Sequence, residues 1–202
     1  MIILGCDNFG KELAKKMGAK FLLIEKRTFP DSEVCPRILN LRQEADNMKN
    51  ETVIFANRMT LPLDPNRYLL ETFLLIKTIN ALNPEKIGVV FPYLVYSRQD
   101  KVFRDGEPLS IKALFDFLHD VGATEFFTVS SHAERDRKML TAPMPAYNIN
   151  GFESIADYFF SKKDKLQNPI VIAPDIKSKT AAKIIADKIG TDFCVMEKHR
   201  DL

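Results

Sequence analysis

One stretch of the chain combines aromatic, basic and acidic side chains in a pattern that suits the binding of a polyphosphate. It covers residues 92–110 and reads PYLVYSRQDKVFRDGEPLS. The guanidinium of Arg98 and the ammonium of Lys101 are close in sequence to the neutral amide of Gln99, and a polyphosphate needs several hydrogen-bond donors and positive charges at once. The same spacing also allows Asp100 to pair with one of the basic groups and orient it.

The place of this stretch in the chain favours a binding loop. The apolar run before it, residues 87–91, predicts a buried strand, and Pro92 ends that strand because proline has no N–H to donate. Gly106 permits a sharp turn, and Ser110 is a good N-cap for a following helix. Open α/β sheets bind ligands beyond the carboxyl ends of their strands. The alternative interpretation is a long, solvated surface loop.

Other candidate residues are scattered along the chain, and most have an ordinary structural explanation when taken alone. A turn before a strand or a charged tail needs no function, and a histidine after a strand is more often a capping or packing group. The candidates are Phe29, Asp31 and Glu33 in a turn, His132 and Asp175 after strands, and Lys198 and Arg200 in the tail.

Composition limits the class of protein. A chain of 202 residues that is 46% hydrophobic can bury the core of one or two domains. A net charge of +2 without a run of lysine or arginine offers no basic field for nucleic acid. No apolar run approaches the ~20 residues that span a membrane, and charges follow the first residues too soon for a signal peptide. Cys6, Cys35 and Cys194 are far apart and in apolar company, which predicts reduced, buried thiols of a cytosolic protein.

Strand and helix patterns alternate over most of the chain, which is typical of βαβ units and a mainly parallel sheet. The expected strands are residues 1–5, 21–24, 34–38, 53–56, 87–91, 126–129, 146–149, 169–173 and 193–196. The expected helices are residues 10–17, 68–82, 111–121, 154–160 and 178–189, the last closed by Gly190. The fold class is therefore α/β, with helices flanking a mainly parallel sheet.

The segment 141–150, which contains Pro143 and Pro145, is the best junction between two domains. We expect one α/β domain over residues 1–145 and a second over residues 146–202. The second has only about 50 residues, fewer than an α/β domain normally uses, and is expected to be incomplete.

The blocks P-Y-x-x-Y-x-R-Q-D-K and G-E-P-x-S, at this mutual spacing, resemble the ATP-binding signature of ribose-phosphate pyrophosphokinases. These enzymes make phosphoribosyl pyrophosphate from ATP and ribose 5-phosphate. The resemblance extends over essentially the whole chain and stops well short of the family's usual end. It implies a cytoplasmic protein with two phosphoribosyltransferase-like domains, of which the second is partial.

The resemblance implies an ATP site that two subunits share. Residues 98–101 (Arg98, Gln99, Asp100 and Lys101) would hold ATP. Phe29, Asp31 and Glu33 would reach the adenine site of a neighbouring subunit from a loop that reads F-P-D-G-E in the family. Ser32 replaces the glycine of that loop, so its backbone could differ. A homodimer or higher homo-oligomer is the consequence.

The resemblance also implies a magnesium site. His132 and Asp175 match a histidine and an aspartate that serve the catalytic Mg²⁺ in the family. The family's D-x-H-A motif reads S-S-H-A here, with Ser130 in place of the acid. Lys177 and Ser178 occupy the region of two family glycines, and side chains there would crowd the approach of a phosphate.

Lys198 and Arg200 match a basic pair at the root of the family's flexible catalytic loop. The family's ribose-5-phosphate loop, an acidic pair followed by T-G-G-T, has no counterpart in the 202 residues. We therefore expect a ribose-phosphate diphosphokinase-type protein that is weak or inactive alone. The alternatives are a non-catalytic regulatory or structural homologue that assembles with a complete synthetase, half of a split enzyme, and a nucleotide-binding α/β protein with another reaction.

Overall fold

The structure is a computed structural model that describes residues 1–59, 64–133 and 137–197. The chain divides into two compact units, Met1–Ile149 and Asn150–Leu202. The first unit extends four residues past the boundary expected at 145, because residues 146–149 pair with a strand of its sheet.

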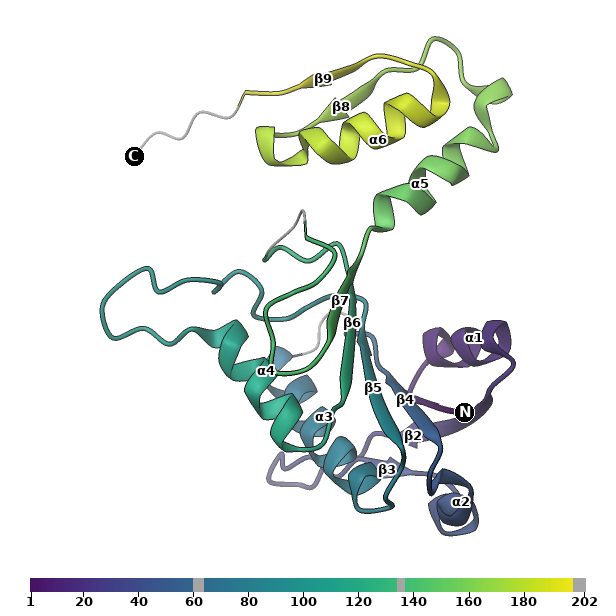
Figure 1. Cartoon of the computed structure of the whole chain (residues 1–202), viewed down its shortest axis with the longest axis vertical. Coiled ribbons are helices and arrows are strands. Elements are labelled where there is room, and N and C mark those ends of the chain that lie inside the picture. Colours follow the sequence, from purple (N-terminus) through teal and green to yellow (C-terminus); the bar gives the residue numbers. More distant parts are fainter. Residues whose placement is uncertain (60–63, 134–136, 198–202) are drawn as a thin grey trace. The chain divides into compact units, whose positions relative to one another are not determined.

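The first unit is built on a seven-stranded sheet with the strand order β3-β2-β1-β4-β5-β6-β7 (Figure 1). The strands are β1 (Ile2–Gly5), β2 (Lys20–Glu25), β3 (Arg37–Ile38), β4 (Thr52–Ala56), β5 (Lys86–Phe91), β6 (Glu125–Val129) and β7 (Ala146–Ile149). All neighbouring pairs are parallel except β2 and β3, which are antiparallel. The expected α/β fold with a mainly parallel sheet is confirmed.

Helices cover both faces of this sheet, as Figure 1 shows. The helices are α1 (Asn8–Met17), α2 (Leu41–Met48), α3 (Pro65–Asn80) and α4 (Ser110–Asp120). Alternate strand residues divide between the two faces: Leu4 and Phe55 pack in the core cluster with α3 and α4 residues, while Ile3 and Ile54 pack with Ala14 of α1. Strands with apolar residues on both faces are what a sheet covered by helices on both sides requires.

Two details of the first unit differ from the expectations. The strand expected at 34–38 is reduced to β3, preceded by an isolated bridge between Thr28 and Val34. The expected N-cap at Ser110 is wrong: this residue is the first of α4, and the cap position is Leu109, which makes no side-chain cap bond. The helix therefore starts without the hydroxyl cap that the sequence suggested.

The second unit is small. It contains α5 (Gly151–Phe160), β8 (Val171–Ala173), α6 (Lys179–Ile189) and β9 (Phe193–Val195), with short 3₁₀ turns at Lys163–Lys165 and Ile176–Ser178. The two strands are parallel, and α6 packs on both of them and on α5. As expected, α6 ends at Gly190, whose left-handed φ of 75° suits glycine.

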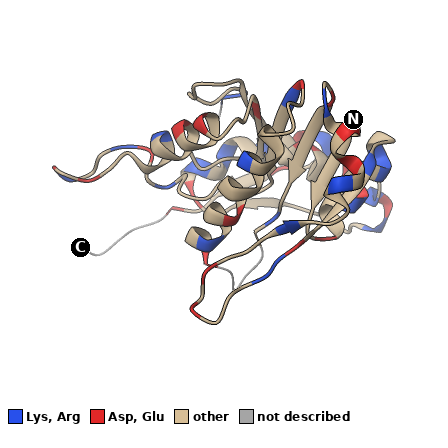
Figure 2. Cartoon of the chain, turned by 90° about the horizontal axis from the view of Figure 1, so that it is seen from below, with Lys and Arg blue, Asp and Glu red and all other residues tan. Residues whose placement is uncertain are grey.

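Lys and Arg residues are interspersed with Asp and Glu residues along the described ribbon (Figure 2). Among the described residues, no helix is long and apolar enough to cross a membrane. All three cysteines are free; Cys6 and Cys35 are half-buried, but Cys194 is exposed, contrary to expectation.

Candidate functional site

The site forms where the neighbouring strands β5 and β6 end. The two strands are parallel and in register, with Phe91 opposite Thr128, so the segments that follow them leave the sheet at the same edge. Here Arg98 and His132 line one cavity of about 170 Å³. The other lining residues are Tyr93, Leu94, Ser97, Val129, Ser130 and Ser131. The structure thus brings together two candidate residues that lie far apart in sequence.

Local backbone geometry places these residues. Leu94 and Val95 are buried and anchor the loop after β5 to the core. Tyr96 adopts a left-handed φ of 60°, and its carbonyl accepts a hydrogen bond from the backbone N–H of Gln99 (3.1 Å). Ser130, with a φ of 49°, turns the chain directly after β6. Non-glycine residues with positive φ cluster at functional sites, because the surrounding structure must hold them there.

The amide of Gln99 organises the loop after β5. Its Nε2 donates to Oε2 of Glu107 at 3.2 Å. The same carboxylate oxygen accepts the backbone N–H groups of Phe103 and Arg104, both at 3.2 Å. Glu107 is therefore a loop-closing residue that the sequence analysis did not single out, although it lies in the G-E-P-L-S block.

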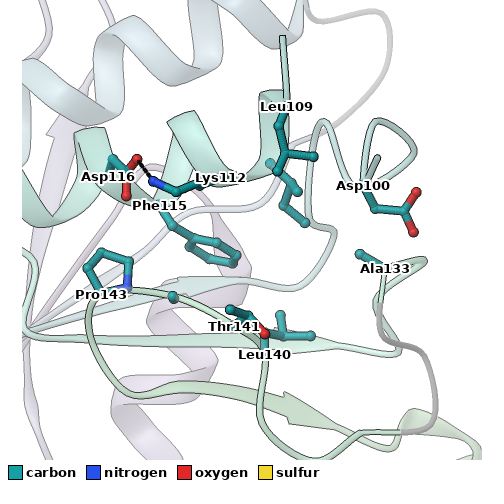
Figure 3. A pocket seen from close by; sticks show the side chains of 11 residues that line it. Asp100, Leu109, Lys112, Phe115, Asp116, Ala133, Leu140, Thr141 and Pro143 are labelled. Atoms are coloured by element: carbon teal, nitrogen blue, oxygen red, sulfur yellow. Dashed lines mark hydrogen bonds and ion pairs between the residues drawn. The ribbon is translucent and has the colours of Figure 1, made fainter. Parts of the chain in front are cut away.

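Asp100 lines a different cavity from Arg98. This second cavity has a volume of about 490 Å³ and mostly apolar walls, to which Leu109, Phe115 and Leu140 contribute (Figure 3). Asp100 makes no ion pair with any described residue, so the possibility that it pairs with a neighbouring basic group is not realised here. Lys101 is exposed and lines neither cavity.

The loop from Phe29 to Glu33 is a tight hairpin. The backbone N–H of Phe29 donates to Glu33 O (2.8 Å), and Asp31 Oδ1 accepts the N–H of Glu33 (3.1 Å). Ser32 adopts a φ of 74°, the region that glycine enters without cost. Phe29 is 46% exposed, and none of these residues lines the Arg98 cavity. Their contact with a nucleotide in a neighbouring subunit stays a prediction.

Asp175 lies in the second unit and caps a 3₁₀ turn. Its Oδ1 accepts hydrogen bonds from the backbone N–H and the hydroxyl of Ser178, both at 3.0 Å. The serine that stands in the region of the family's glycines thus binds the aspartate itself. Lys198 and Arg200 lie outside the described residues.

Among the described residues, the donor set around His132 lacks the carboxylates that a resident magnesium ion usually has. The lining residues of the Arg98 cavity supply an imidazole, a phenol, serine hydroxyls and a guanidinium, without a carboxylate. Among the residues that the structure describes, no group of three or more His, Cys, Asp or Glu could hold a metal ion. Mg²⁺ prefers carboxylate, phosphate and water oxygens, so the contribution of His132 to a magnesium site stays a prediction.

Side-chain hydrogen bonds fix the residues that follow the neighbouring strands β1 and β4. Cys6, after β1, donates from Sγ to Asn57 Oδ1 (2.9 Å), and the Tyr68 hydroxyl donates to the carbonyl of Asn57 (2.9 Å). Burial raises the pKa of the Tyr68 phenol well above its ordinary value, and burial also raises the pKa of the Cys6 thiol. Both groups are therefore neutral hydrogen-bond donors at physiological pH and fix Asn57 in place.

Comparisons with known proteins give one consistent match. The family model described as the N-terminal domain of ribose phosphate pyrophosphokinase matches residues 3–122. The ribose-phosphate pyrophosphokinase of Sulfolobus acidocaldarius is 30% identical, over all of this chain and 66% of its own length. That of Pyrococcus abyssi is 33% identical, over 97% of this chain and 62% of its own length. The chain thus spans just under two thirds of the length of these curated relatives.

A solved structure has the same fold. The crystal structure of phosphoribosylpyrophosphate synthetase from Mycobacterium smegmatis superposes with a TM-score of 0.79, covering 99% of this chain and 65% of that chain. The sequence identity is 20%, so this likeness concerns the fold alone.

Proposed function

The chain belongs to the ribose-phosphate pyrophosphokinase family, and from this premise we propose that its first unit binds the triphosphate of magnesium ATP at the Arg98 cavity. The observation that carries the proposal is the meeting of Arg98 and His132 in one cavity at the carboxyl ends of β5 and β6. Mg²⁺ enters as part of the substrate, on the phosphate oxygens, with His132 and Asp175 as the protein groups that serve it.

The proposed reaction transfers a diphosphoryl group to ribose 5-phosphate, a step of nucleotide biosynthesis in the cytoplasm. The anomeric hydroxyl oxygen attacks the β-phosphorus, and the bond from that phosphorus to the oxygen bridging it to the α-phosphate breaks. AMP leaves with that oxygen, and the hydroxyl proton passes to solvent. Such transfers depend on positioning and charge neutralisation more than on covalent chemistry by the protein.

The protein's groups have distinct parts in this proposal. Arg98 and Lys101 neutralise phosphate charge, and Gln99 holds the loop in its binding conformation through Glu107. The hairpin of Phe29, Asp31 and Glu33 reaches the adenine in a second copy of the chain, which makes the working unit a homo-oligomer. Lys198 and Arg200 close over the transferring group.

A second candidate function is nucleotide binding without catalysis, within an assembly that contains a complete synthetase. One observation favours it. Asp175, which would serve metal and sugar, is hydrogen-bonded to Ser178 through its carboxylate.

Calorimetry with magnesium ATP on the wild type and on Arg98→Ala tests the binding proposal. We expect the variant to bind at least about tenfold more weakly, because it loses a charged donor to phosphate. Arg104→Ala is the matched control, since Arg104 belongs to the same loop and does not line the cavity. Equal affinity of the wild type and Arg98→Ala would rule out the assignment.

A further inference from the structure

The hydroxyl of Ser131 is buried without a hydrogen-bond partner. Ser131 is 2% exposed, and its Oγ contacts no donor or acceptor among the described residues. Buried hydroxyls are nearly always paired, and an unpaired one lowers stability, so each exception needs an explanation. Ser131 is one of the residues that line the Arg98 cavity, so its side chain is next to the space where a ligand would bind.

The backbone holds Ser131 firmly in this position. Its N–H donates to Oδ1 of Asn148 at 2.9 Å, and Nδ2 of Asn148 donates to the carbonyl of Arg137 at 3.0 Å. Asn148 belongs to β7 and is buried. The residue before Ser131 has a positive φ that turns the chain at this point. The backbone of Ser131 is therefore fixed before any ligand binds, and such preorganisation lowers the cost of association.

The cavity has the size and chemistry for a phosphate group. Its volume of about 170 Å³ is well below that of sites for whole drug-sized ligands, ~300–1,000 Å³. It equals the space of roughly five or six water molecules. The polar groups of its lining residues are the Arg98 guanidinium, the His132 imidazole, the Tyr93 phenol and three serine hydroxyls, without a carboxylate that would repel an anion.

We propose that Ser131 is a phosphate-binding residue of this site, whose hydroxyl donates to a phosphate oxygen that Arg98 also contacts. The inference rests on the proposed function for the identity of the site and adds a residue that neither the motif nor the resemblance indicated. The phosphate supplies the acceptor that the hydroxyl lacks in the free protein. A bond to a charged acceptor makes about a tenfold difference in affinity.

The test separates ligand binding from folding stability. Thr128→Val is a matched control, because Thr128 is also fully buried with an unpaired hydroxyl but does not line the cavity. We expect both Ser131→Ala and Thr128→Val to unfold at the same or higher urea concentration than the wild type. In calorimetry, Ser131→Ala should bind magnesium ATP and inorganic pyrophosphate at least about fivefold more weakly, while Thr128→Val should bind like the wild type.

A second variant guards against a local packing effect. Ser131→Cys keeps nearly the same volume with a much weaker donor, and should lose affinity as Ser131→Ala does. If the Ser131 variants lose affinity for magnesium ATP alone, the phosphate that Ser131 binds belongs to the nucleotide. If they lose affinity for pyrophosphate equally, Ser131 belongs to a subsite that accepts any phosphate.

If both Ser131 variants bind magnesium ATP like the wild type while Arg98→Ala binds it more weakly, the Ser131 assignment is overturned and the proposed function is left intact. A wild type that binds neither ligand would overturn both.

Discussion

The side-chain amide of Gln99 donates a hydrogen bond to the carboxylate of Glu107 at 3.2 Å, and this bond closes the loop that carries Arg98. The two residues lie at either end of the polar part of that loop. In the family signature the glutamine stands beside the arginine as a nucleotide ligand. In this structure its Nε2 is engaged with the loop itself, so in the proposed site Gln99 would act by ordering the loop.

Replacing Glu107 should therefore weaken ATP binding without unfolding the chain. Glu107→Ala removes the acceptor of three hydrogen bonds, from Gln99 and from the backbone of Phe103 and Arg104. Ordering the loop then becomes part of the cost of binding, and we expect about five- to twentyfold weaker affinity by calorimetry. Asp105→Ala, an exposed carboxylate of the same loop, is the control and should bind normally. Equal losses of ATP affinity in Glu107→Ala and Asp105→Ala would indicate that removal of any negative charge from the loop changes binding, and would contradict a specific role of Glu107.

The hairpin at Ser32 offers a stability prediction. Ser32 has a φ of 74°, and glycine adopts this conformation without the steric cost that a Cβ brings. Ser32→Gly should raise the free energy of unfolding by about 0.5–1 kcal/mol, measured by urea denaturation. Ser110→Gly, at the start of α4, should instead lower it by a similar amount, because glycine loses more entropy in a helix. A loss of stability in Ser32→Gly would contradict the account.

Much of this fold could be predicted from the sequence, because strand and helix patterns carry their own physical signals. The apolar runs that became β1, β4 and β5 are buried on both faces, as a central parallel strand must be. Helix α2 was missed, because its sequence LRQEADNM has few apolar residues and only Met48 is fully buried. The packing of one buried side chain leaves no repeating pattern of apolar residues in the sequence, and such a pattern is what predicts a helix.

The candidate site could be predicted only in part. The motif indicated Arg98 and His132, and the parallel pairing of β5 with β6 explains why they meet. The motif could not show that Asp100 lines the second cavity, because the direction of each loop residue depends on the left-handed turn at Tyr96. Nor could it indicate Ser131, whose relevance depends on burial and on a missing partner.

The shared adenine site can be tested by mixing variants. If Phe29 of one copy serves the site that contains Arg98 of another, Phe29→Ala and Arg98→Ala oligomers each have every site damaged. After subunit exchange, a mixed dimer has one doubly damaged site and one intact site. Calorimetry should then recover high-affinity ATP binding in the mixture, at up to about a quarter of the wild-type stoichiometry for random dimers. No recovery, or a monomer by sedimentation velocity at micromolar concentration, would contradict the shared site.

The last prediction concerns catalysis by the 202 residues alone. The proposed determinants for ATP lie in the first unit, but the 202 residues contain no Thr-Gly-Gly-Thr segment for the ribose 5-phosphate. The carboxylate of Asp175 is also hydrogen-bonded to Ser178. If these residues lack a site for the sugar phosphate, the attacking hydroxyl is not oriented, and such positioning can supply ~7–11 kcal/mol of a barrier.

We therefore expect little or no phosphoribosyl pyrophosphate from this polypeptide by itself, in an assay that follows AMP release from magnesium ATP and ribose 5-phosphate. Turnover near ~1 s⁻¹, ordinary for an enzyme, would contradict this expectation and favour a sugar site built from other residues. Activity that appears only after a second polypeptide with the Thr-Gly-Gly-Thr segment is added would instead assign the two substrates to two chains. In that case Arg98→Ala should abolish the complemented activity, because the ATP site would still lie in this chain.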